Sequence, residues 1–206
     1  MSRAVLITAG ATRNPIDAMR YISAWSSGRT GVALARALAP RHPVHLLASA
    51  EASLRAGDVC PTEGFGSTRD LQARMHAWID ANPAGVVVHA AAVGDYEADA
   101  EGGKIPSGQA ELLVRLKPAP KILDGLRPRA PGLFLVSFKA AGPETTPEAL
   151  VDICRAQLQR TGSDLVFGNV IGAIASTATL VDPHAHQRYA SRDDAIAALA
   201  QAISGR

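Results

Sequence analysis

Several apolar runs end directly in residues that can bind phosphate or a metal ion. The first leads into Thr8-Ala-Gly10-Ala-Thr-Arg13, where glycine permits close backbone approach and the hydroxyl and guanidinium groups suit phosphate. A lone glycine also fits a simple turn at a strand end. A later run leads into Ala90-Ala-Ala-Val-Gly-Asp95-Tyr96, whose small residues leave room for a flat ligand. Asp95 suits a ribose hydroxyl or Mg²⁺, and equally a turn.

Further charged groups follow the same pattern. Lys139 directly follows an apolar run and faces either solvent or a phosphate. Arg20 and Arg29 flank Ser26-Ser27-Gly28, which precedes a predicted helix. The free N–H groups of a helix start bind anions, although serine also caps helices without a ligand. Lys104 alone is an ordinary lysine of a glycine-rich loop. Together these groups suit phosphates and a divalent cation better than a dehydrogenase site.

An alternation of strands and helices must position these residues. The fold class predicted is α/β, a Rossmann-like, mostly parallel sheet with helices on both faces. Short apolar runs predict strands over 5–8, 44–47, 86–89, 133–138 and 165–167. Apolar residues at three-and-four spacing predict helices over 30–39, 68–81, 147–160 and 192–203. Ser67 and Thr146-Pro147 are typical helix starts.

Three stretches break this alternation. The polar run 13–25 delays the first helix beyond what a dinucleotide-binding turn allows. Residues 97–110 form a polar glycine-rich loop, followed by a predicted strand over 111–116. Two extended pieces, 178–181 and 187–190, predict a C-terminal hairpin. Without a convincing linker, we expect a single domain over residues 1–206.

Composition excludes several classes of protein. Hydrophobic residues make up 47% of the 206 residues and charged residues 19%, as in a folded globular protein. A net charge of +2 from scattered basic residues argues against a nucleic-acid partner. No apolar run approaches the roughly 18 residues of a membrane helix, and a signal peptide is not expected. Cys60 and Cys154, read as free thiols, indicate the cytoplasm.

The motifs jointly resemble the phosphopantothenate–cysteine ligase family, also called phosphopantothenoylcysteine synthetases. The resemblance rests on Ile7-Thr-Ala-Gly-Ala-Thr-Arg-Asn-Pro-Ile-Asp17, Arg20-Tyr-Ile-Ser23 and Ser26-Ser-Gly-Arg-Thr-Gly31. It continues through Ala90 to Tyr96, Gly103-Lys-Ile105, Leu116 to Leu123, Val136-Ser-Phe-Lys139 and Asp164-Leu-Val-Phe-Gly-Asn169. Order and spacing match across nearly the whole chain, which we expect to be a stand-alone, divergent member.

The resemblance implies an acid–amino-acid ligase of coenzyme A biosynthesis. In the family, the carboxylate of 4′-phosphopantothenate attacks the α-phosphate of a nucleoside triphosphate, and cysteine then displaces the nucleotide from the acyl-nucleotide. The implied co-substrate is CTP rather than ATP, with Mg²⁺, in a homodimer that binds small molecules and neither nucleic acid nor a membrane. The flavin-binding decarboxylase half that often precedes this domain is expected on another polypeptide.

The resemblance also assigns roles residue by residue. Lys104 matches the catalytic lysine of a mobile loop that closes over the reacting phosphates. The nucleotide site is matched by Gly10, Ala91, Asp95, Phe138, Lys139 and Asn169, with Asp95 also a candidate metal ligand. The acid-substrate site, partly across the dimer interface, is matched by Arg20, Ser26, Ser27, Gly28 and Ala92.

Departures from the family pattern leave alternatives open. After Tyr-Ile-Ser the family typically has an asparagine tied to the reaction with cysteine, and this chain has Ala24. One alternative is therefore a diverged paralogue that activates a different acid or uses a different amine. A nicotinamide-dependent Rossmann reductase is another, weakened by the missing GxGxxG motif. A non-catalytic nucleotide-binding protein is the last.

Overall fold

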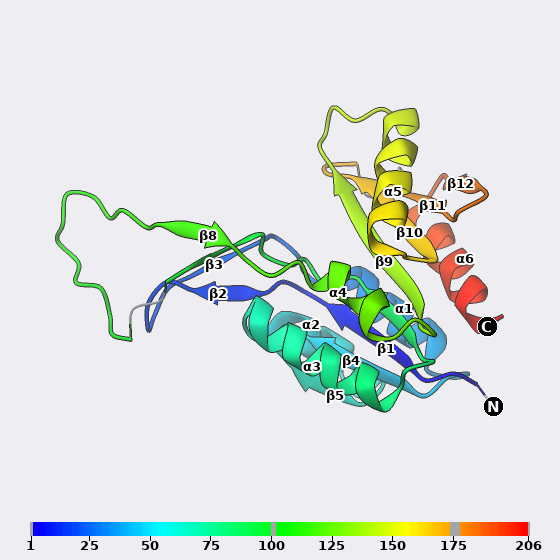
Figure 1. The fold of residues 1–206 in the computed structure, drawn as a ribbon, viewed down its shortest axis with the longest axis horizontal. Coiled ribbons are helices and arrows are strands. Elements are labelled where there is room, and N and C mark those ends of the chain that lie inside the picture. Colours follow the sequence, from blue (N-terminus) through cyan, green and yellow to red (C-terminus); the bar gives the residue numbers. More distant parts are fainter. Residues whose placement is uncertain (1, 100–101, 174–177, 206) are drawn as a thin grey trace.

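The central feature of the fold is an eight-stranded sheet with the order β12-β11-β10-β9-β6-β1-β4-β5 (Figure 1). The computed structural model describes residues 2–99, 102–173 and 178–205. The strands are β1 (Val5–Ala9), β4 (Val44–Ala48), β5 (Thr62–Gly64), β6 (Val86–His89), β9 (Phe134–Ala141), β10 (Leu165–Val170), β11 (Ala178–Val181) and β12 (His186–Tyr189). Neighbouring strands from β10 to β5 in this order pair in parallel. Strand β11 pairs antiparallel with β10, and β12 pairs antiparallel with β11. The predicted fold class and C-terminal hairpin are confirmed.

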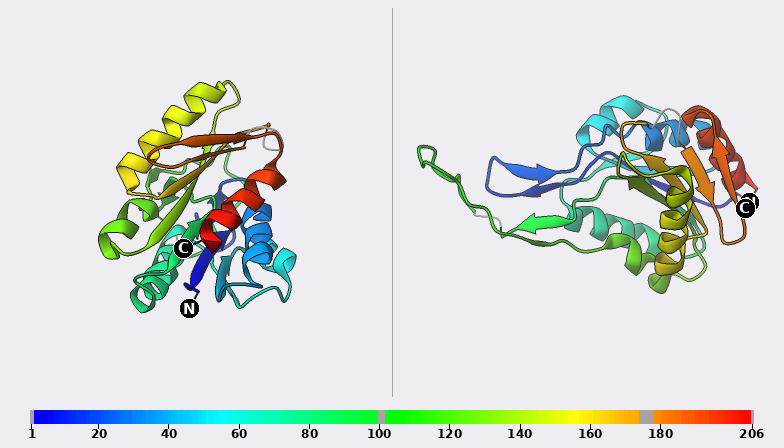
Figure 2. Two further views of the ribbon diagram at one scale, coloured as in Figure 1. Left: turned by 90° about the vertical axis from the view of Figure 1, so that its right-hand side faces the viewer. Right: turned by 90° about the horizontal axis from the view of Figure 1, so that it is seen from above.

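Helices cover both faces of this sheet, as Figure 2 shows. They are α1 (Arg29–Leu38), α2 (Ala50–Ala56), α3 (Thr68–Ala81), α4 (Ile122–Arg129), α5 (Pro147–Thr161) and α6 (Arg192–Ser204). Side chains that alternate along β1 separate the two cores, because successive residues of a strand point to opposite faces. Val5 and Ile7 pack with α1, α2 and α6, whereas Leu6 packs with α3 and α4. The alternation of apolar residues therefore explains the layers.

Two of the predicted helix starts are confirmed by their caps. The side chain of Ser67 accepts a hydrogen bond from the backbone N–H of Asp70 at 3.2 Å, and Thr146 accepts one from Ala149 at 3.2 Å. Pro147 occupies the first turn of α5, where its missing N–H costs no hydrogen bond.

A long arm projects from the carboxyl edge of the sheet (Figures 1 and 2). We call residues 13–23, 96–99 and 102–118 the arm. It contains the ribbon of β2 (Arg13–Pro15) and β3 (Tyr21–Ser23), and that of β7 (Tyr96–Ala98) and β8 (Leu116–Pro118). Asn14 Nδ2 donates to the carbonyl oxygen of Tyr96 at 2.8 Å and ties the two ribbons together. The polar run that delays α1 is thus half of the arm.

The sequence-based prediction of a strand over 111–116 is wrong. Residues 111–115 have no regular secondary structure, and only Leu116 belongs to the short strand β8. Leu113 is 84% exposed, so the apolar residues of this segment do not mark a buried face. Helices α2 and α4 were not predicted, because each is short and buries few side chains.

Among the described residues, no helix combines the length and apolar character that crossing a membrane requires.

Candidate active site

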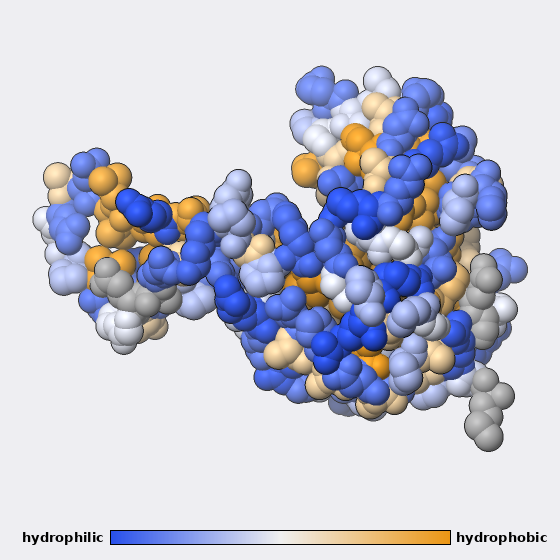
Figure 3. Space-filling view, in the orientation of Figure 1, coloured by the Kyte–Doolittle hydropathy of each residue, from blue (hydrophilic) through white to orange (hydrophobic). Residues whose placement is uncertain are grey.

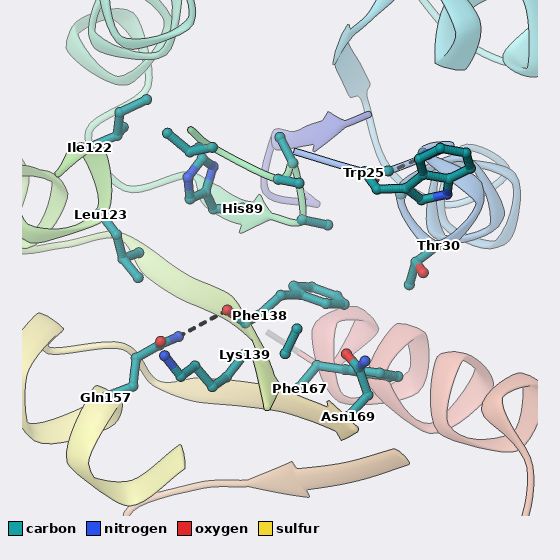
Figure 4. A pocket seen from close by; sticks show the side chains of 18 of the residues that line it. Trp25, Thr30, His89, Ile122, Leu123, Phe138, Lys139, Gln157, Phe167 and Asn169 are labelled. Atoms are coloured by element: carbon teal, nitrogen blue, oxygen red, sulfur yellow. Dashed lines mark hydrogen bonds between the residues drawn. The ribbon is translucent and has the colours of Figure 1, made fainter. Parts of the chain in front are cut away.

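The strand order places a crevice at the carboxyl edge of the sheet. The chain moves from β1 to β4 and β5 on one side, then crosses to β6 on the other side of β1. Such a reversal leaves a crevice beyond the strand ends in open α/β sheets. A cavity of about 890 Å³ lies there, within the range of roughly 300–1,000 Å³ typical of ligand sites (Figure 4). Its walls come from the segment after β6, the ends of β9 and β10, and the starts of α1 and α6.

The segment after β6 is fixed to the end of β1 by hydrogen bonds. The hydroxyl of Thr8 accepts from Ala91 N at 3.0 Å, and that of Thr12 accepts from Gly94 N at 2.9 Å. Ala92 N donates to the carbonyl of Gly10 at 2.8 Å. Ala91 and Ala92, both predicted site residues, therefore present a rigid wall of small side chains to the cavity.

Gly10 and Gly28 are required by close packing behind that wall. A Cβ on Gly10 would lie 2.0 Å from Ser49 Oγ, and one on Gly28 would lie 2.5 Å from Ala52 Cβ. Both have positive φ, at 92° and 73°, which disfavours other residues. Gly28 lines the cavity, whereas Gly10 lies outside its lining. The predicted contact of Gly10 with a nucleotide stays a prediction, and its observed role is to let the segments approach.

The start of α1 lines the cavity and has no side-chain cap in the described structure. Its N-cap is Gly28, with no side-chain capping bond, whereas Ser49, Ser67, Thr146 and Ser191 cap other helices. Ser26 and Ser27, the predicted serines, line the cavity beside it. Free N–H groups at a helix start attract phosphate or carboxylate groups. The expected anion site is thus structurally available.

An aromatic and polar wall faces this helix start. The rings of Phe138 and Phe167 stack with centroids 4.9 Å apart, and Lys139 and Asn169 follow them on the same strands (Figure 4). Gln157 Nε2 donates to the carbonyl of Phe138 at 3.2 Å and holds the strand end. The structure therefore brings the predicted residues Phe138, Lys139 and Asn169 into one cavity with Ala91 and Asp95.

Cations exceed anions on the cavity walls. Asp95 pairs with Lys121, and Asp124 pairs with Arg160. In the part of the chain that the structure describes, Arg29, Lys139 and Arg192 line the cavity without an ion pair within 4.0 Å. The described residues also hold no group of three His, Cys, Asp or Glu side chains that would bind a metal. Asp95 alone fits a Mg²⁺ ion only if a substrate supplies most of its ligands.

His89 is a site residue that the sequence analysis missed. It ends β6, lines the cavity and lies 3.0 Å from the Thr8 hydroxyl through Nδ1. Burial lowers the pKa of His89 to about 4, so the imidazole is neutral near pH 7. A single polar residue that ends an apolar strand was the available signal.

Arg20 and Lys104 lie on the arm, outside the cavity lining. Arg20 pairs with Asp17 and donates to the carbonyl of Ile105 at 3.3 Å. The carbonyl of Gly103, next to Lys104, accepts from Ala18 N at 3.2 Å. A single chain therefore does not bring Arg20 or Lys104 to the residues of the cavity, and their predicted roles stay predictions.

A second cavity of about 650 Å³ adjoins the first and shares Trp25, Ser26, Ser27 and Arg29 with it. Ala24 lines it, at the position where the family typically has asparagine, together with Arg13 and Arg55. The guanidinium of Arg13 lies 4.8 Å from the centre of the Tyr21 ring. Ala24 thus shares this lining with Arg13 and with Arg55, whose guanidinium pairs with Glu51 of the same lining.

Comparison with known proteins decides the family. A family model described as the DNA/pantothenate metabolism flavoprotein C-terminal domain matches residues 1–201. The chain belongs to this family. The coenzyme A biosynthesis bifunctional protein CoaBC of Thermococcus kodakarensis is 38% identical over 175 residues, which cover 84% of this chain. The chain matches 42% of the length of that relative.

Two solved structures share the fold. The DNA/pantothenate metabolism flavoprotein from Streptococcus pneumoniae superposes with a TM-score of 0.89 at 23% identity, covering 99% of both chains. A mutant of Cab2 in complex with phosphopantothenate-cysteine has a TM-score of 0.80 at 22% identity, covering 98% of this chain and 86% of the other. The resemblance to the phosphopantothenate–cysteine ligase family is confirmed at the level of family and fold, and it argues against the reductase alternative.

Proposed function

We propose that the chain is a nucleotide-dependent ligase of coenzyme A biosynthesis that joins 4′-phosphopantothenate to cysteine. The observation that carries the proposal is the convergence of Ala91, Ala92, Lys139 and Asn169 with the uncapped start of α1 around one cavity. These are the positions of the family motifs, and family membership supports the same chemistry. The CoaBC relative is a longer bifunctional protein, of which this chain matches 42%.

In the first step, a carboxylate oxygen of the acid bonds to the α-phosphorus of the nucleotide and pyrophosphate leaves with the electrons of the broken P–O bond. The amine of cysteine then attacks the acyl carbon, loses a proton and releases the nucleoside monophosphate. Both steps require charged phosphates to be held in fixed positions. The free cations Arg29 and Lys139 and the N–H groups of α1 supply that neutralisation.

We propose CTP in preference to ATP as the nucleotide, as the family resemblance implies. Small residues at the end of β6 leave room for a flat base beside Phe138. Asn169 supplies an amide to the base or ribose, and Asp95 contacts the ribose or the Mg²⁺ that arrives with the triphosphate. When bound, Mg²⁺ neutralises phosphate charge.

For the acid substrate we propose Ser26, Ser27, Gly28 and Ala92, with Arg20 and Lys104 contributed by the arm of a second copy. Exposed apolar side chains on the arm support a homodimer, since surfaces of this kind mark interaction sites (Figure 3). They include Met19 (66% exposed), Tyr96 (53%) and Leu113 (84%). A dimer would bring Lys104 near a cavity that it does not reach within its own chain.

The state of the two cysteines is compatible with the reducing cytoplasm. Cys60 and Cys154 are both free, and burial raises the pKa of Cys154 to about 11, which keeps its thiol protonated and unreactive. We therefore propose that the protein acts in the cytoplasm.

One observation favours a second candidate, a paralogue with a different amine acceptor. Ala24 lines the second cavity without a side chain that can hydrogen-bond, together with Arg13 and with Arg55, which pairs with Glu51 of the same lining. An amine with a carboxylate beyond the one that cysteine carries would add a partner for Arg13.

The decisive experiment measures pyrophosphate release from CTP or ATP with Mg²⁺ and 4′-phosphopantothenate, with and without cysteine, and identifies products by mass spectrometry. The proposal expects pyrophosphate and the cysteine amide in equal amounts. An acyl-nucleotide that accumulates with cysteine but is consumed by another amino acid would support the second candidate. No pyrophosphate with either nucleotide would contradict both.

A further inference from the structure

The wall of the cavity between the starts of α1 and α6 carries two arginines that form no ion pair within 4.0 Å among the described residues. Arg29 and Arg192 both line the cavity. Burial is the main cause that lowers the pKa of the Arg192 guanidinium; Asp193 opposes this shift, and the positive charge of Arg29 adds to it. Among the described residues, no ion pair within 4.0 Å joins Asp193 to either arginine. Two like charges therefore lie close together beside an open space.

The Arg192 side chain is held in place yet incompletely hydrogen-bonded. Its Nη2 donates to the Thr30 hydroxyl, which fixes the guanidinium against the first turn of α1. Its Nε is buried without a hydrogen-bond partner in the described structure. A buried donor without a partner is costly, and two adjacent guanidinium groups repel each other. Both costs are relieved by one anion that accepts from Arg192 and faces Arg29.

The position of Arg192 places the proposed anion in the first cavity. Arg192 lines the first cavity, with Phe138 and Asn169, and is not part of the lining of the second cavity, which contains Ala24. Arg29 borders both cavities. An anion between the two arginines thus lies in the first cavity, which both the nucleotide and the acid substrate are proposed to enter, and its charge must distinguish the two. A group with several negative charges suits two guanidinium donors better than a single phosphate ester does.

We infer that Arg192, anchored by Thr30 and paired with Arg29, binds the terminal phosphates of the nucleoside triphosphate and holds the pyrophosphate leaving group. This inference rests on the proposed use of a nucleoside triphosphate and extends it to a residue of the C-terminal helix. Neutralising the leaving group stabilises the charge that develops as the P–O bond breaks.

Calorimetric titration of CTP, CMP, pyrophosphate and 4′-phosphopantothenate into the full chain and its Arg192→Gln variant tests this inference. We expect the variant to bind CTP and pyrophosphate at least tenfold more weakly, while its affinities for CMP and 4′-phosphopantothenate change less than twofold. Arg188→Gln is the matched control, because Arg188 lies on β12 outside the cavity lining, where it pairs with Glu148 of α5. It should bind every ligand like the parent chain.

Other results would overturn the inference. Unchanged pyrophosphate binding by the variant, or equal losses for CTP and CMP, would exclude a role at the terminal phosphates. If Arg192→Gln does not fold, Thr30→Val decides, since it keeps the charge and removes the anchor. Thr30→Val should weaken the binding of CTP and pyrophosphate by about threefold and leave the binding of CMP less affected.

The two proposals can fail separately. Arg192-dependent binding of CTP and pyrophosphate without any amide product would contradict the proposed ligase and leave this inference standing. Amide formation by an Arg192→Gln variant that binds pyrophosphate normally would support the proposed ligase and contradict the role of Arg192. A chain that binds neither a triphosphate nor pyrophosphate would overturn both.

Discussion

The hydroxyl of Thr8 lies 3.0 Å from Nδ1 of His89, and the same hydroxyl accepts the N–H of Ala91. Thr8 is fully buried, so its single proton requires an acceptor inside the protein. Nδ1 of a neutral imidazole is that acceptor, which leaves the ring proton on Nε2. The pair thus defines the tautomer of a cavity residue and connects the ends of β1 and β6.

His89 makes the protein sensitive to acid. The pKa of His89 is lowered by burial from 6.5 to about 4, so the unfolded chain binds a proton in this interval and the folded chain does not. Stability should therefore fall as the pH drops from about 6.5 to 4, by about 3 kcal/mol in total. Urea unfolding at several pH values should show this slope, and His89→Gln should reduce it. An equal slope in the variant would assign the effect to other groups.

Gly10→Ala should destabilise the fold more than Gly57→Ala. Both glycines have positive φ, at 92° and 59°, but only at Gly10 would a Cβ collide, 2.0 Å from Ser49 Oγ. Backbone strain alone predicts about 1 kcal/mol at Gly57, and the collision should raise the loss at Gly10 to about 2–4 kcal/mol. Chemical denaturation measures both. Equal losses would mean that Ser49 moves aside freely.

Asp17 should control the order of the arm. Its carboxylate accepts from the N–H groups of Met19 at 2.7 Å, Arg20 at 2.6 Å and Ile105 at 3.1 Å. Burial opposes ionisation, but these bonds and the Arg20 charge outweigh it and lower the pKa of Asp17 to about 2. The contribution of Asp17 is thus complete above its ordinary pKa near 3.8 and is lost as the pH falls toward 2.

Asp17→Asn should therefore accelerate amide hydrogen exchange at these three residues at neutral pH, while exchange in β1 stays unchanged. Asp99→Asn is the matched control on the same arm, because Asp99 forms an exposed ion pair with Lys117. Equal acceleration in both variants would show a general effect of lost charge.

Lys104→Gln should lower the rate of the proposed reaction by at least a hundredfold and leave nucleotide affinity within about threefold. A lysine that meets the phosphates only as they react stabilises the transition state and not the bound ground state. Lys117→Gln removes an equal charge from the arm and should retain activity. Parallel losses of rate and nucleotide affinity would argue against a transition-state role.

Much of the fold could be predicted because apolar runs and helical spacing coincide with burial. Leu6, Ile7 and Val87 are fully buried, and their strands were predicted. The short strands of the arm escaped prediction, because they bury few side chains and residues such as Leu113 are exposed. At the site, Ala91, Asp95, Phe138, Lys139 and Asn169 meet as their strand ends suggest. Arg192 required the structure, since a single polar residue in a helix carries no spacing signal, and His89 offered only its place at the end of an apolar strand.

The edges of the sheet have a consequence for how copies of the protein meet. Strand β5 has three residues and β12 has four, and most of their side chains are exposed and polar. Short polar edges offer a poor template for strand addition, the usual route by which open sheets aggregate. Concentrating the protein should therefore not lengthen the sheet from one molecule to the next. Association is left to surfaces such as the arm, whose contacts can be discrete and reversible.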